Sequence, residues 1–142
     1  MSLEEKVGQL GIFADMLRPF VPGINPEMNE HDAAQTLERV RSGRAGALVN
    51  GVGAPLGRVA QRVAGEETRL GIPLLFGADV IHGMRTVFPI PLGEAASFEP
   101  ALAKRTARAA AVEATATGLH WTFAPTVDIA RDQRWGRVAE AA

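Results

Sequence analysis

The sequence predicts an α/β fold with a parallel sheet, the arrangement that opens a (β/α)8 barrel, with about three βα units after an N-terminal helical extension. Two short apolar runs, at residues 45–50 and 72–76, have the length of buried strands, and a helical pattern at residues 56–70 joins them. An alanine-rich segment at residues 101–117 then leads to a third apolar run at residues 120–128. Because strands joined by helices pair in parallel through right-handed crossovers, this order predicts a parallel sheet.

The composition is typical of a globular protein and excludes several classes of function. The chain has 142 residues, 46% of them hydrophobic, and its formal net charge of -1 does not direct it toward nucleic acid or an anionic membrane. It has no cysteine, which excludes disulfides, thiolate catalysis and cysteine-bound zinc. The three histidines, His31, His82 and His120, lack a ligand spacing, so we expect neither a metal nor another cofactor.

The N-terminus predicts a capped helix. Ser2 and Glu5 have the spacing of a capping box, and Val7 and Leu10 would form the apolar face of the helix that follows. The first residues are polar and acidic and contain no apolar leader. If Met1 is the native start, this pattern predicts a cytoplasmic protein; otherwise the location is unknown.

A second helix is expected after an irregular connection. Residues 19–30 contain three prolines and two asparagines, which disfavour a repeating element. Residues 32–41 then have a helical pattern, with Leu37 and Val40 directed inward and Gly43 ending the helix.

Turn residues separate the later elements. A glycine-rich turn is expected at residues 51–57, and the Phe-Pro-Ile-Pro segment at residues 88–91 is too rich in proline for a sheet. Pro100 suits the first turn of the alanine-rich helix, and Gly118 ends that helix.

Asp79 is the first candidate site residue, since it lies just beyond the second apolar run. The carboxyl end of a buried parallel strand is where α/β folds bind ligands. A carboxylate at that point either holds a ligand or caps the following turn, and its spacing does not distinguish the two.

One interpretation is half of a dinucleotide-binding fold. Gly51, Gly53 and Gly57 follow the first strand, and Asp79 has the position of a ribose-binding acid. The third glycine is one position late, however, and Pro55 removes an amide from the loop that would bind pyrophosphate. In the simpler reading, the glycines only turn the chain from strand to helix.

The other interpretation is the start of a barrel whose strand ends meet at one mouth. Asn50, Asp79 and Asp128 would all point to that mouth, beside an arginine-rich loop. Carboxylates accept and guanidiniums donate hydrogen bonds, so such a site suits the hydroxyl groups of a sugar. Trp121 and Trp135 could stack on a pyranose ring, although each is more often part of a core.

Several linked motifs occur in one order along the chain. They are Gly-Ala-Asp-Val-Ile-His-Gly at residues 77–83, Thr-Val-Phe-Pro-Ile-Pro-Leu-Gly at 86–93, Ala-Ala-Ser-Phe-Glu-Pro at 95–100, Phe-Ala-Pro-Thr-Val-Asp at 123–128, and Arg-Asp-Gln-Arg-Trp-Gly-Arg at 131–137 with Glu140. This series resembles the N-terminal domain of glycoside hydrolase family 3, close to its bacterial β-glucosidase branch. The Asp-Val-Ile-His-Gly form disfavours the N-acetylhexosaminidase branch. The resemblance implies that residues 1–142 are a partial TIM-type barrel domain.

The resemblance also implies roles for individual residues. Asp79 matches the aspartate that binds glucose hydroxyls in the -1 subsite, and Arg137 matches an arginine that binds the same sugar. Four further positions match a supporting shell, namely Arg131, Trp135, Glu140 and His82. A purely structural role for His82 is at least as common. Gln133 and Glu94 depart from the family pattern, but neither departure affects the two binding positions.

Catalysis would need residues that the resemblance places elsewhere. Family members are retaining enzymes, with an aspartate nucleophile and a glutamate acid/base that would both lie beyond residue 142. The chain alone is therefore expected to be inactive and to bind a β-glucoside or oligosaccharide once the rest of the barrel and a C-terminal domain complete it, in cis or in trans. Because its third strand would be an exposed edge, the chain alone is expected to be unstable or to associate. The alternative is a sugar-binding or assembly fragment without catalysis.

Overall fold

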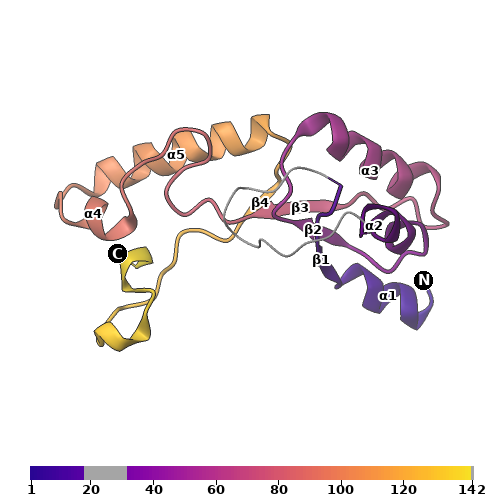
Figure 1. The fold of residues 1–142 in the computed structure, drawn as a ribbon, viewed down its shortest axis with the longest axis horizontal. Coiled ribbons are helices and arrows are strands. Elements are labelled where there is room, and N and C mark those ends of the chain that lie inside the picture. Colours follow the sequence, from indigo (N-terminus) through magenta and orange to yellow (C-terminus); the bar gives the residue numbers. More distant parts are fainter. Residues whose placement is uncertain (18–31, 142) are drawn as a thin grey trace. The chain divides into compact units, whose positions relative to one another are not determined.

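The computed structural model describes residues 1–17 and 32–141 (Figure 1). The expected irregular connection at residues 19–30, and His31, lie outside the described residues. The described elements are α1 (Leu3–Gln9), β1 (Ile12–Ala14), α2 (Asp32–Arg41), β2 (Ala47–Val49), α3 (Ala54–Glu66), β3 (Leu75–Ala78), α4 (Pro91–Ala95), α5 (Pro100–Ala116), β4 (Trp121–Thr122) and two short 3-10 helices, η1 (Gln133–Trp135) and η2 (Val138–Glu140).

The chain divides into two compact units. Unit 1 comprises Met1–Ala78 with Thr117–Trp121, and unit 2 comprises Asp79–Ala116 with Thr122–Ala142.

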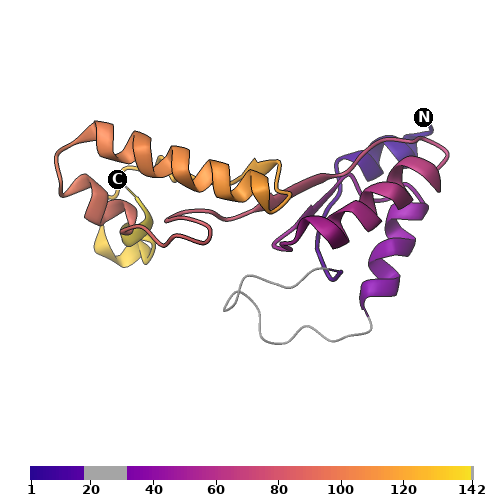
Figure 2. The same ribbon diagram turned by 90° about the horizontal axis from the view of Figure 1, so that it is seen from above.

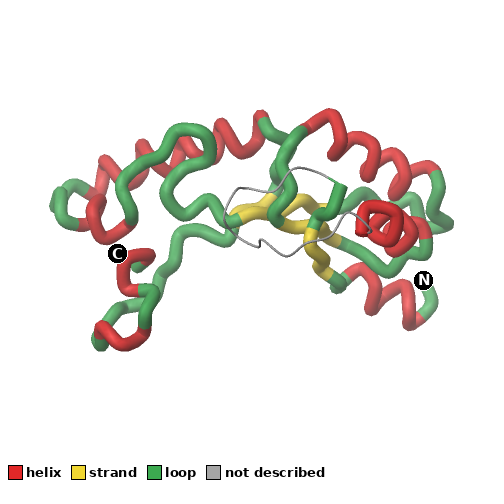
Figure 3. Tube along the Cα trace, viewed as in Figure 1, coloured by secondary structure: helices red, strands yellow, loops and turns green. Residues whose placement is uncertain are grey.

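The strands form the parallel sheet that the sequence predicts. Their order is β1-β2-β3-β4, and the yellow strands in Figure 3 lie side by side. Ile12 is opposite Ala47 in the parallel pair β1/β2, and Ala47 is opposite Leu75 in the parallel pair β2/β3. In the sequence α2 lies between β1 and β2, and α3 lies between β2 and β3, as the connection of parallel strands requires.

The strand β1 was not expected, and the apolar face proposed for the first helix is wrong. Ser2 and Glu5 do form the capping box, but the helix ends at Gln9. Val7 and Leu10 are 61% and 86% exposed. Gly8 is buried instead, and a Cβ there would come within 2.1 Å of the carbonyl oxygen of Gly43, so this helix approaches its neighbour through a residue without a side chain.

The core of unit 1 lies between the sheet and its helices. Leu48 and Phe76 are fully buried in adjacent strands, and α2 packs on α3 (Figure 2). Burying side chains of this size contributes about 1.5–3 kcal/mol each. The ring of His120 stacks on Phe76 with centroids 5.4 Å apart, and its Nδ1 accepts a hydrogen bond from the Phe76 amide. His120 is therefore a structural residue.

The helix predictions hold more closely than the strand predictions. The helix at residues 32–41 has the expected bounds; Val40 is buried, Leu37 is half-buried, and Gly43 follows with φ +69°. The alanine-rich helix begins at Pro100, as predicted, and Gly118 has φ +88°.

The expected strand at residues 120–128 is confined to Trp121–Thr122, because the Thr122 hydroxyl binds the Ala124 amide and Pro125 has no amide to donate. The proline-rich segment at residues 88–91 is a loop up to Ile90, but Pro91 already begins α4. In unit 2, α4 packs on both α5 and η2.

None of the helices that the structure describes is long and apolar enough to cross a membrane.

Candidate active site

Asp79 is placed at the end of a buried strand. It directly follows β3, whose last three residues are buried, and its own side chain is exposed. The strand fixes the backbone, while the carboxylate remains open to solvent. This is the position that the sequence predicts for a ligand-binding acid.

Arg137 is fixed by an ion pair with Glu140. The Arg137 Nε donates to Glu140 Oε1 at 3.0 Å, and Nη2 donates to Oε2 at 2.5 Å. Gly136, at φ +84°, turns the chain from η1 to η2 and so brings the two side chains onto one short segment. A carboxylate that binds a guanidinium through two nitrogens restricts the orientation of the arginine as well as its position.

The electrostatics of Arg137 connect it to two other acids. The hydrogen bond to Glu140 is the main cause that raises the pKa of the Arg137 guanidinium, and the charges of Asp79 and Asp128 raise it further. The same ion pair lowers the pKa of Glu140. The charges of Asp79 and Asp128 therefore reach Arg137, and we refer to Asp79, Asp128, Arg137 and Glu140 as the polar cluster of unit 2.

The cluster of Asp79, Asp128, Arg137 and Glu140 combines hydrogen-bond acceptors with a donor whose orientation is fixed. Neutral hydroxyl groups can donate to the carboxylates and accept from the guanidinium. This arrangement suits a polyhydroxylated ligand.

The segment before Arg137 holds the expected supporting residues. Trp135 ends η1 and is 42% exposed. Asp132 caps η1, accepting from the Arg134 amide at 2.9 Å and binding the Arg134 guanidinium, which lowers the pKa of Asp132. Arg131 is exposed and has no ion pair among the residues that the structure describes.

His82 lies in the loop that follows Asp79. The carbonyl oxygen of His82 accepts a hydrogen bond from the Phe88 amide at 2.7 Å, which closes the loop, while the His82 side chain is exposed. Gly83 has φ +109°, and a Cβ there would come within 1.9 Å of the Thr86 carbonyl oxygen. The loop therefore needs glycine at this position.

A cavity of about 550 Å³ lies beside this loop in unit 2. His82, Phe88 and the alanine-rich face of α5 contribute to its walls, which are mostly apolar. Asp79 and Arg137 are not among the residues that line it.

Sequence reasoning missed two structurally important carboxylates. Glu113 on α5 accepts hydrogen bonds from the loop around Thr86. Asp15 is fully buried just after β1 and accepts from the Leu17 amide. The pattern that singled out Asp79, a short apolar run ending in an acid, also occurs at residues 12–15 and could have revealed both β1 and Asp15. Nothing in the local sequence marks Glu113.

Among the described ranges, 1–17 and 32–141, no group of three or more His, Asp or Glu side chains is placed to hold a metal ion.

Parallel βα units with a polar cluster beyond a strand end define an α/β protein of the barrel-forming class. The chain belongs to glycosyl hydrolase family 3, because the model of the "Glycosyl hydrolase family 3 N terminal domain" matches residues 2–141.

Relatives and solved structures agree with this membership. The chain is 40% identical over 140 residues to the periplasmic beta-glucosidase of Salmonella typhimurium, covering 99% of this chain and 17% of that enzyme. It is 34% identical over 153 residues to a putative beta-xylosidase of Formosa agariphila, covering 99% of this chain and 20% of that protein. The beta-glucosidase of Listeria innocua in complex with glucose has a TM-score of 0.80 and 39% identity, covering 99% of this chain and 19% of that structure. The chain thus spans about a fifth of the length of these proteins.

These matches confirm the resemblance and the fold, which is the N-terminal part of a TIM-type barrel. They also overturn the expected cytoplasmic location, since the Salmonella typhimurium relative is a periplasmic enzyme. The polar residues at the start were not informative about export, because this chain spans only 17% of that relative.

Proposed function

We propose that this chain is the substrate-binding N-terminal part of a retaining β-glucosidase-type hydrolase that removes terminal β-D-glucosyl residues. The observation that supports the proposal best is the polar cluster, in which Glu140 holds the Arg137 guanidinium within the electrostatic reach of Asp79 and Asp128. The relatives named beta-glucosidase, and the Listeria innocua enzyme solved with glucose, support the class of sugar.

In this proposal Asp79 and Arg137 bind the terminal sugar from two sides. The Asp79 carboxylate accepts from sugar hydroxyls, and the Arg137 guanidinium donates to them. Glu140 orients the guanidinium, and Trp135, Arg131 and His82 support the site. No residue of the chain is proposed as nucleophile or acid/base.

The proposal treats residues 1–142 as part of a barrel domain that other sequence completes. The strands and helices described here would supply one side of the substrate site. The chemistry would come from residues outside this chain, in the same polypeptide or in a partner. On its own the chain would bind sugar weakly and would not hydrolyse it.

A chimera tests this proposal. The chain replaces the N-terminal segment that it matches in the Salmonella typhimurium enzyme, and hydrolysis of an aryl β-D-glucoside is measured. We expect an active chimera and an inactive isolated chain. Glucose binding by a chimera that is folded but never hydrolyses any substrate would support a binding module instead.

Replacing Asp79 separates a binding role from a turn cap. Asp79→Ala in the chimera should lower kcat/KM by about a hundredfold or more, because charged hydrogen bonds to the sugar strengthen in the transition state. Glu66→Ala, an exposed carboxylate at the end of α3, is the matched control and should leave the rate unchanged. A loss below about tenfold for Asp79→Ala would contradict the assignment.

A further inference from the structure

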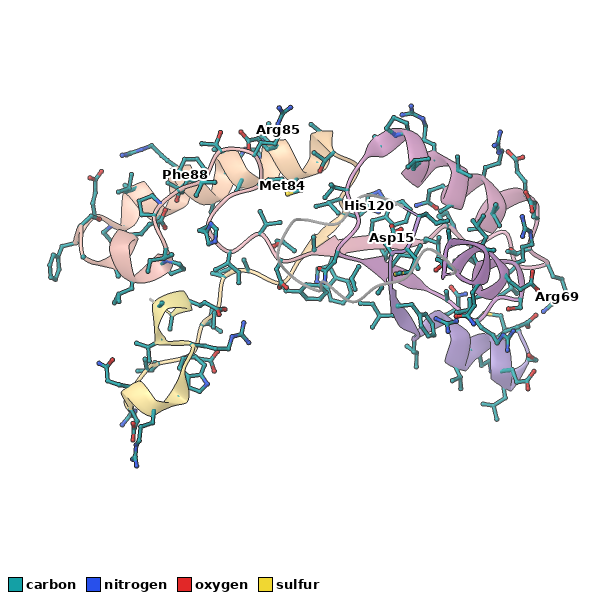
Figure 4. The ribbon with its side chains drawn as sticks, viewed as in Figure 1. Asp15, Arg69, Met84, Arg85, Phe88 and His120 are labelled. Atoms are coloured by element: carbon teal, nitrogen blue, oxygen red, sulfur yellow. The ribbon has the colours of Figure 1, made fainter. Side chains whose placement is uncertain are left out.

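Glu113 holds the loop that follows Asp79. It lies on α5, and its Oε2 accepts hydrogen bonds from the backbone amides of Arg85 and Thr86, each at 2.8 Å. Its Oε1 accepts from the Thr86 hydroxyl at 2.6 Å. One side chain thus satisfies three donors on two consecutive residues that are 27 and 28 positions away in sequence. Figure 4 shows Arg85 and Phe88 alongside α5.

The loop itself has little packing to fix it there. Arg85, Thr86 and Val87 are all exposed, and Val87 is 75% exposed. Since buried apolar contacts are what usually stabilise a loop, these three exposed residues depend on the hydrogen bonds to Glu113 for their attachment to α5.

Thr86 also packs closely against the part of the loop that lies nearest to Asp79 in the sequence. Its carbonyl oxygen lies so close to Gly83 that a Cβ there would approach it to 1.9 Å. The His82 carbonyl oxygen is bound by the Phe88 amide at 2.7 Å. The segment from His82 to Phe88 therefore folds back on itself as one closed turn, and fixing Thr86 fixes His82, three residues after Asp79.

The charge of Glu113 suits this role. The hydroxyl of Thr86 and the amides of Thr86 and Arg85 lower the pKa of Glu113, in that order of importance. The carboxylate is therefore ionised at neutral pH, and an ionised acceptor forms stronger hydrogen bonds than a neutral one.

We propose that Glu113 is a positioning residue, which attaches the loop of residues 82–88 to α5 and thereby sets the position of His82, three residues after Asp79, in the sugar site. The effect on sugar rests on the proposed function. The attachment of the loop does not, and the two are tested separately.

Amide hydrogen exchange tests the attachment in the chain and in the chimera. Glu113→Ala should speed the exchange of the Arg85 and Thr86 amides about tenfold or more, since both lose their acceptor. Glu113→Gln should retain most of the protection, because its amide oxygen can accept from both backbone amides while its amide nitrogen donates to the Thr86 hydroxyl. Arg108→Ala, an exposed change on the same helix, is the control and should leave exchange at Arg85 and Thr86 unchanged.

Kinetics of the chimera test the positioning. Glu113→Ala should raise KM for an aryl β-glucoside and lower kcat, and Glu113→Gln should restore both to within about threefold. In acid, the wild-type loop should lose protection as Glu113 is protonated, whereas the loop of Glu113→Gln should not change with pH.

Each result has one meaning for the proposal. Unchanged exchange in Glu113→Ala overturns it, whatever the activity. Faster exchange with unchanged KM and kcat leaves Glu113 as a structural residue and overturns the positioning role.

If the chimera is inactive throughout, the proposed function fails. A glucose titration that detects no difference between Glu113→Ala and the wild type then overturns the positioning role. If Glu113→Ala does not fold, Thr86→Val removes only the hydroxyl donor and should give a smaller change in the same direction; no change in exchange or KM would overturn the proposal.

Discussion

Arg137 and Glu140 form an ion pair in which two nitrogens of the guanidinium meet both carboxylate oxygens, with Nε 3.0 Å from Oε1 and 3.2 Å from Oε2. The pair is local, since its members are three positions apart in the sequence, and both side chains remain partly exposed at 60% and 31%. Exposed pairs of this kind stabilise a fold little. Its significance is the orientation that it gives to a hydrogen-bond donor within electrostatic reach of Asp79.

Replacing the guanidinium by an ammonium should therefore reduce activity even though the charge is kept. Arg137→Lys in the chimera should lower kcat/KM about 10–100-fold, because lysine cannot bind Glu140 and a sugar hydroxyl through one planar fork. Arg134→Lys, in the neighbouring Asp132 pair, is the matched control. Equal kcat/KM for Arg137→Lys and the wild type on an aryl β-glucoside would show that orientation is unimportant.

The ion pair between Glu5 and Arg69 should make the stability of the folded chain depend on pH. The Arg69 guanidinium binds Glu5 through Nε at 2.9 Å and is the main cause that lowers the pKa of Glu5 from its ordinary 4.5 to about 2; the Ser2 amide contributes next. A lowered pKa means that the stabilisation is complete above the ordinary pKa and is lost as the pH falls toward 2.

Glu5→Gln should thus lower Tm by about 2 °C at pH 7 and by progressively less as the pH falls below 4.5. Thermal unfolding of the chain at one fixed concentration measures this, because association would also shift Tm. Glu4→Gln, which removes an exposed carboxylate from the same helical turn, should show no such trend. A Tm difference for Glu5→Gln that stays constant from pH 7 to pH 3 would contradict the assignment.

The helices were easier to predict than the short strands because their signals are longer. Ten residues of periodic pattern predict α2, whereas β1 has only three residues, too few to show a period. The run after β4 is largely apolar, but the strand ends at Thr122 because the Thr122 hydroxyl accepts from the Ala124 amide and Pro125 has no amide to donate.

The site residues, like the helices and strands, were easier to predict where the pattern is local in the sequence. Asp79 could be identified from its place after a strand, whereas Arg137 was identified only through the family resemblance. Glu113 could not be identified from either, because its role comes from a contact across 27 residues.

Gly83, the one glycine of the loop at residues 80–90, should tolerate a side chain poorly. Gly83→Ala combines an unfavourable φ of +109° with a clash against the Thr86 carbonyl oxygen, and should cost about 2 kcal/mol or more. Gly53→Ala has φ +118° but no atom within 4 Å of the new Cβ, so it isolates the backbone strain.

Gly65→Ala, inside α3 with open space around the Cβ, should instead stabilise the chain by about 0.5–1 kcal/mol. Thermal unfolding ranks the three variants, and a Gly83→Ala variant as stable as Gly53→Ala would show that the loop can move away from the clash.

The sheet of unit 1 predicts self-association of the isolated chain. Ile12, Ala47 and Leu75 are register partners across three parallel strands and therefore lie in one row on the same face. Ala47 is buried, but Ile12 and Leu75 are 43% and 51% exposed at the two ends of the row. In a complete barrel such a row would face further side chains, whereas in the isolated chain it favours contact with a second copy.

Sedimentation should show oligomers whose proportion rises with concentration. The double variant Ile12→Lys/Leu75→Lys should shift the chain toward monomer, because two charges at the ends of the row oppose its burial. The exposed pair Arg58→Ala/Arg62→Ala on α3 is the control and should not change the distribution. A wild-type chain that sediments as a well-folded monomer at all concentrations would contradict this prediction of self-association.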